Sequence, residues 1–83
     1  MNKYYKLLMA ALVDKGEKDK LQESQRAWIK FRDAEFEIIN ILYPQDYTLY
    51  INIRAADKMS IVKERALQLK HYVEIQENEL KNN

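Results

Sequence analysis

The residues of this chain that could take part in acid–base, nucleophilic or metal chemistry stand far apart in the sequence. The single histidine, His71, precedes Glu74 by three residues, so the two side chains can share one face of a helix. Two ligands do not make a zinc site, and the chain has no cysteine and no second histidine. Ser24 and Ser60 have no nearby base in the sequence to activate a hydroxyl group. We therefore expect no catalytic residues, no metal and no cofactor, and we predict that the protein is not an enzyme.

Three carboxylates crowd one short stretch of the chain, at Asp33, Glu35 and Glu37. Carboxylates that are buried together raise one another's pKa, which is one route to acid–base chemistry. Carboxylates on a long helix, however, usually form its solvated face. We interpret these three as a solvated face.

The segment from residue 24 to residue 35 has the most unusual content and holds the only tryptophan. Gln25, Trp28 and Arg32 stand at positions i, i+3 and i+7, so one helix face presents an amide, an indole and a guanidinium group. Arg32 is expected to lie over the Trp28 ring, a contact worth about 0.5–2 kcal/mol depending on exposure. Two interpretations stay open, a packed polar layer and a binding face, since Trp, Tyr and Arg dominate interface hot spots.

Length and composition define the elements that must position these residues. A chain of 83 residues has room for one domain, residues 1–83. Its 47% of hydrophobic residues exclude a disordered chain, and one Gly and one Pro are too few for the turns of a multi-stranded sheet. A net charge of +1 with interleaved signs argues against a nucleic-acid partner. No apolar run approaches the roughly 20 residues of a membrane span.

The first two expected helices follow from apolar spacing and from the two strong helix breakers. The first should cover about residues 3–15 and end at Gly16 in the left-handed conformation that closes many helices. The second should cover about residues 20–42, with Asp19 as its N-cap. It should end there because Pro44 disfavours helical geometry in the residue before it.

A third helix is predicted over about residues 46–80, either continuous or kinked near Ser60. The expected fold is therefore all-α, a three-helix antiparallel bundle with two long helices and with Trp28 and Phe31 in the main core. The third helix also carries apolar residues in steps of three and four, typical of a coiled-coil seam. That seam can pair with a second copy as a homo-oligomer or fold back on the second helix, and its residues are Met59, Val62, Leu69, Val73 and Leu80.

The segment from Gln25 to Glu35 closely resembles the central Q-x-x-W-x-x-[FY]-R-D-A-E motif of small bacterial envelope domains named after the lysozyme inhibitor LprI. Two flanking segments agree with it. N-K-Y-Y-K-L-L-M-A-A-L at residues 2–12 looks like the family's opening, and I-V-K-E-R-A-L-Q-L at residues 61–69 is similar to its ending. The resemblance spans residues 2 to about 69.

The chain departs from the family pattern at its cysteines. Family members usually carry one Cys directly after D-A-E and another shortly before the closing motif, where this chain has Phe36 and Asp57. We expect an aromatic contact in place of the missing bridge. Members also typically begin with an export signal and a further Cys-containing stretch, so we expect a trimmed domain of a periplasmic or secreted protein.

The resemblance implies a non-catalytic envelope binding domain with a protein partner, such as a lysozyme-type wall hydrolase. Lysozymes are typically basic, so the net charge of +1 argues against strong electrostatic steering. The alternative is a structural, self-associating helical domain. The candidate binding residues lie on one helical surface and in the turn after the second helix, whose two tyrosines could fill sugar subsites: Gln25, Trp28, Arg32, Asp33 and Arg65, with Tyr43, Asp46 and Tyr47.

Overall fold

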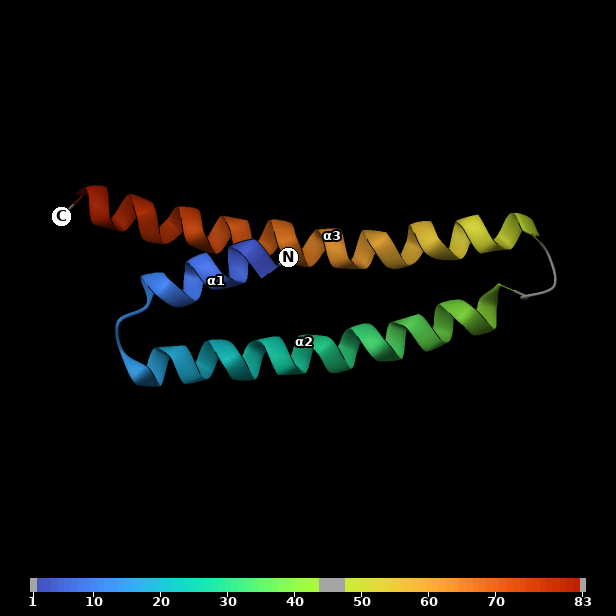
Figure 1. Ribbon diagram of the computed structural model, residues 1–83, viewed down its shortest axis with the longest axis horizontal. Coiled ribbons are helices and arrows are strands. Elements are labelled where there is room, and N and C mark those ends of the chain that lie inside the picture. Colours follow the sequence, from blue (N-terminus) through green and yellow to red (C-terminus); the bar gives the residue numbers. More distant parts are fainter. Residues whose placement is uncertain (1, 44–47, 83) are drawn as a thin grey trace.

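The described part of the chain forms three helices. The structure is a computed structural model that describes residues 2–43 and 48–82, with side chains in the last helix as far as Asn78. Helix α1 covers Asn2–Ala11, α2 covers Lys15–Leu42 and α3 covers Thr48–Asn82 (Figure 1). The predicted all-α fold with two long helices is confirmed.

The two long helices lie side by side and run in opposite directions (Figure 1). Helix α1 packs along the half of α3 that leads to the C-terminus, parallel to α3 and antiparallel to α2. The molecule measures 56 × 22 × 14 Å. Its long dimension is close to the length of α3, since 35 residues at about 1.5 Å each span about 52 Å. One half of the molecule is therefore three helices thick and the other half is only two.

Helix α3 is continuous, so the alternative of a kink near Ser60 is wrong. Its 35 residues contain no glycine or proline, and Ser60 lies in its interior. Without a breaker nothing interrupts the ladder of backbone hydrogen bonds. The expected start at residue 46 lies outside the described residues.

The seam predicted for self-association is partly used within the chain. Leu69 is 0% exposed and Val73 is buried in the chain's own core, whereas Met59 is 70% exposed. Val62 is half-buried, and the side chain of Leu80 lies outside the described part. Leu69 and Val73 therefore pack within the chain itself, as the alternative to self-association predicts.

The predicted boundary between the first two helices is wrong by several residues. Helix α1 ends at Ala11, and α2 begins at Lys15 instead of residue 20. Gly16 lies in the first turn of α2 and does not adopt a positive φ. The reason is the cap, because the extended backbone of Asp14 places its carboxylate to accept a hydrogen bond from Gly16 N at 3.0 Å.

This cap gives a direct prediction for the stability of α2. Asp14→Ala should lower the free energy of unfolding by about 0.5–2 kcal/mol, because a first-turn N–H loses its acceptor. Asp19→Ala is the matched control, since Asp19 is exposed inside α2 and should change stability by no more than about 0.5 kcal/mol. Urea unfolding followed by circular dichroism measures both. A larger loss at Asp19 than at Asp14 would contradict this N-cap.

The hydrophobic core lies in the half of the molecule where α1 covers the long helices. Its buried residues come from all three helices, and they are Leu8, Leu21, Leu69 and Val73, flanked by Tyr4, Tyr5, Met9 and Leu12. The expectation that Trp28 and Phe31 form the main core is wrong. Trp28 is half-buried and Phe31 is 53% exposed, because they face a region that only α2 and α3 enclose.

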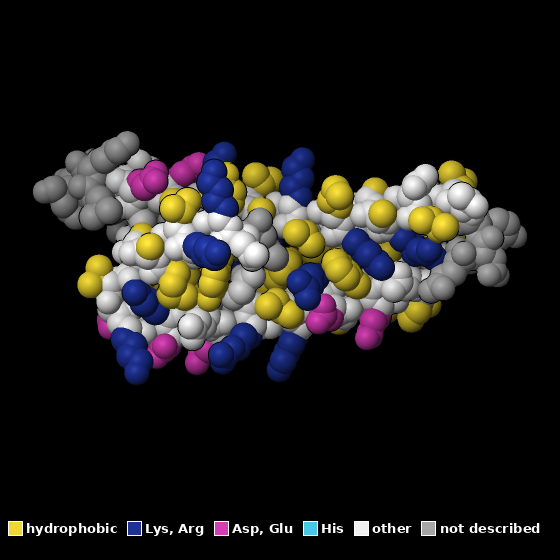
Figure 2. Space-filling view, in the orientation of Figure 1, with side chains coloured by type: hydrophobic (Ala, Val, Ile, Leu, Met, Phe, Trp, Pro, Cys, Tyr) yellow, Lys and Arg dark blue, Asp and Glu magenta, His cyan; other side chains and the backbone are white. Residues whose placement is uncertain are grey.

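The surface mixes charges of both signs with exposed apolar groups. Figure 2 shows basic and acidic side chains interspersed on one face, with hydrophobic side chains visible between the long helices. Within the described residues, no helix combines the length and apolar character needed to cross a membrane.

Candidate functional site

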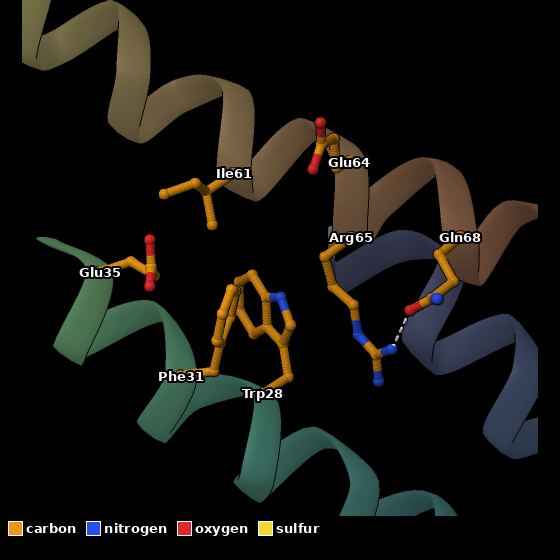
Figure 3. Close-up of a pocket in the computed structure, with 7 residues that line it drawn as sticks. All are labelled: Trp28, Phe31, Glu35, Ile61, Glu64, Arg65 and Gln68. Atoms are coloured by element: carbon orange, nitrogen blue, oxygen red, sulfur yellow. Dashed lines mark hydrogen bonds between the residues drawn. The ribbon is translucent and has the colours of Figure 1, made fainter.

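A groove lies between α2 and α3 in the described part of the chain. It has a volume of about 330 Å³ and lies where the two long helices face each other without α1 (Figures 1 and 3). Its lining residues are Trp28, Phe31 and Glu35 from α2, with Ile61, Glu64, Arg65 and Gln68 from α3. On each helix these positions recur at three- and four-residue spacing, so each helix contributes a single face.

Arg65 sits at one end of this groove and is 6% exposed. Its guanidinium donates from Nε to Gln25 Oε1 at 3.1 Å and from Nη2 to Ser24 Oγ at 3.3 Å, and from Nη1 to Gln68 Oε1. Burial lowers the pKa of Arg65, and interaction with Tyr72 opposes that shift. Among the described residues no carboxylate forms an ion pair with Arg65. Its charge is therefore held between the helices by neutral oxygens.

Arg32 and Trp28 meet on α2 as their spacing predicts. The guanidinium carbon of Arg32 lies 5.5 Å from the centre of the Trp28 ring and 5.9 Å from that of Phe36. Arg32 also forms an ion pair with Asp33, with Nη2 2.9 Å from Oδ1. A guanidinium in this range is attracted to the electron-rich face of an aromatic ring. Gln25, in turn, joins this surface to Arg65 through the hydrogen bond between α2 and α3.

Phe36 and Asp57, which the motif resemblance aligns with cysteines, have separate partners. The ammonium of Lys58 lies 5.4 Å from the centre of the Phe36 ring, so Phe36 faces α3 next to Asp57. Asp57 itself interacts with Tyr43 and raises the pKa of that tyrosine. The aromatic contact expected at Phe36 is thus a ring–cation contact with Lys58, the residue after Asp57.

Tyr43 lies at the end of α2 and is not among the groove residues. Its ring centre is 5.8 Å from that of Tyr50, and Arg54 Nη1 donates to its carbonyl oxygen at 3.2 Å. The hydrogen bond to Asp57 and that residue's negative charge raise the pKa of Tyr43. A raised pKa means that this interaction is present below the usual tyrosine pKa and is lost as pH rises through the folded value. Asp46 and Tyr47 lie outside the described residues, so the binding role predicted for this turn stays a prediction.

Several residues that line the groove are not among the predicted binding residues. Glu35 was assigned to a solvated face, yet it is half-buried at the groove wall. A search for the i, i+3, i+7 pattern of Trp28, Phe31 and Glu35 would have found the α2 wall. The α3 wall shows the same spacing in Ile61, Glu64 and Gln68, beside the predicted Arg65, but none of these residues is aromatic.

In the described part of the chain, the residues considered for metal or acid–base chemistry do not form a cluster. His71 is exposed, and its ring lies 6.3 Å from that of Tyr72. Within the residues that the structure describes, no three His, Asp or Glu side chains come together as metal ligands. The absence of a metal or cofactor stays a prediction.

Fold and groove together define a class of protein, a small all-helical domain with an open groove between two long antiparallel helices. The comparisons with known proteins make this more specific. The family model for the lysozyme inhibitor LprI matches residues 1–69 of the 83, so the chain belongs to the LprI lysozyme inhibitor family. Searches of curated proteins and of solved structures gave no significant match.

Proposed function

We propose that this chain is a non-catalytic binding domain of the bacterial envelope, acting in the periplasm or outside the cell. Its partner is a protein, a cell-wall hydrolase of the lysozyme type, and its binding surface is the groove between α2 and α3. Membership of an inhibitor family supports both the kind of partner and the absence of catalysis. The extracytoplasmic location follows from the target, since lysozymes act on the cell wall.

One observation carries the choice of surface, namely the aromatic side chains that the groove leaves accessible. Trp28 is half-buried and Phe31 is 53% exposed, and both line the groove. An aromatic side chain that is held in place and still accessible supplies much contact area at little entropic cost. Self-association as the sole function has less support, because two residues of its predicted seam, Leu69 and Val73, are buried within the chain.

Inhibition of a lysozyme by the purified chain tests this function. We expect equimolar protein to slow the clearing of a cell-wall suspension by an animal-type lysozyme. Phe31→Ala should weaken the inhibition by about fivefold or more, because truncating an interface hot spot costs over about 1 kcal/mol. Ile41→Ala is the control, since Ile41 is 74% exposed and is not a groove residue. Unchanged lysis at a large excess of wild-type protein would remove lysozyme as the target.

A further inference from the structure

We propose that the groove receives a cationic side chain, a lysine or an arginine of the partner protein, between its aromatic and carboxylate walls. This inference rests on the proposed function, because it takes the groove to be the partner-binding surface. The inference adds the chemical class of the partner's side chain that enters the groove.

Two carboxylates line the groove without a cation of their own. Glu35 stands on the α2 wall and Glu64 on the α3 wall (Figure 3). Within the described residues neither takes part in an ion pair. With two glutamates and one arginine among its lining residues, the groove carries a formal charge of −1 at neutral pH. A guest cation would gain attraction from both walls.

The aromatic side chains between these carboxylates favour a cation as well. Trp28 and Phe31 both project from α2 toward α3 (Figure 3). The contact with Arg32 shows that this indole accepts a guanidinium, with 5.5 Å between the guanidinium carbon and the ring centre. Arg32 does not line the groove, and Asp33 neutralises its charge. The groove thus combines ring surface with uncompensated negative charge, the pairing that recognises organic cations.

An anionic guest fits these observations less well, although Arg65 is a lining residue. Three of the five N–H groups of its guanidinium already donate, to Gln25, Ser24 and Gln68. A carboxylate entering the groove would meet Glu35 and Glu64 as like charges. Like charges brought together at a binding surface disfavour a partner, so the groove selects against anions.

A small cationic probe tests the inference without any lysozyme. N-acetyl-arginine methylamide carries the guanidinium, and N-acetyl-citrulline methylamide is its neutral counterpart of nearly the same shape. Trp28 is the only tryptophan of the chain and lines the groove, so its fluorescence and the NMR signal of its indole N–H report occupancy. We expect saturable changes with the arginine derivative and at least about threefold weaker binding of the citrulline derivative.

Charge removal on the groove walls supplies the matched variants. The double substitution Glu35→Gln and Glu64→Gln should weaken binding of the arginine derivative by about three- to tenfold, since each exposed ion pair contributes modestly. Glu37→Gln is the control, because Glu37 is an exposed carboxylate of α2 that does not line the groove. It should leave the affinity unchanged. Helical circular dichroism checks that all variants are folded.

The outcomes separate this inference from the proposed function. Equal binding of the two probes, no binding of either, or full affinity in the double variant overturns the cation site. If the arginine derivative binds as expected but lysozyme is not inhibited, the cation site holds and the proposed target is wrong. If lysozyme is inhibited equally by wild type and the double variant, the proposed function holds and the cation site is wrong.

Discussion

Leu69→Ala is expected to lower the free energy of unfolding by about 2–5 kcal/mol, the usual cost of truncating a buried leucine. Leu69 is 0% exposed and packs in the core where all three helices meet. A domain of this length has a total stability of only about 4–12 kcal/mol. The substitution therefore removes a large share of the stability, and thermal or urea unfolding followed by circular dichroism measures it.

Leu67→Ala provides a matched control on the same helix. Leu67 lies two residues before Leu69 and is 53% exposed, so its truncation removes far less buried surface. We expect a loss below about 1 kcal/mol. A cost at Leu67 equal to that at Leu69 would contradict this core. If that cost also grew with protein concentration, the exposed face of α3 would be covered by a second copy.

Two substitutions of Arg65 are expected to differ in their effect on the free energy of unfolding. Arg65→Ala should lower the free energy of unfolding by about 1–3 kcal/mol, because it removes both the packed stem and the hydrogen bonds between α2 and α3. Arg65→Met should stay within about 1 kcal/mol of the wild type, because it keeps the stem and removes a charge that is costly to bury. The lowered pKa of Arg65 agrees, since burial disfavours its charged form.

Arg26 supplies the comparison for these two variants. It is an exposed arginine of α2, and Arg26→Ala should change stability by no more than about 0.5 kcal/mol. Chemical unfolding of all three variants gives the ranking. A loss in Arg65→Met as large as that in Arg65→Ala would mean that the charge and its hydrogen bonds stabilise the fold. Arg65→Met should also keep or strengthen binding of the arginine probe, because the groove loses its like charge.

Local spacing was enough to predict what happens within one helix. The shortage of glycine and proline predicts long helices, and α2 and α3 have 28 and 35 residues. The four-residue step from Trp28 to Arg32 predicts the contact that the structure shows. The motif around Trp28 identifies the family before any fold is known. Even within one helix the prediction of the N-cap at Asp19 is wrong, because the carboxylate of Asp14 caps the first turn of α2 instead.

The contacts between helices could not be predicted in this way. Arg65 meets Gln25 across 40 positions of sequence, and nothing in either segment specifies that pairing. Phe31 looks like a core residue by type, yet it is 53% exposed because α1 is only 10 residues long and covers the other half of the molecule. Glu35, predicted on a solvated face, lies at the groove wall because α3 runs alongside α2 there.

The sequence by itself determined the helices, the family and the faces that each helix can offer, because these depend on residues within a few turns of one another. Tertiary structure alone decided which faces meet, and with them the open groove and the unpaired carboxylates along it. The physical reason is that the register of two long antiparallel helices follows from the sum of many packing contacts along their length. No single residue of either helix encodes that sum.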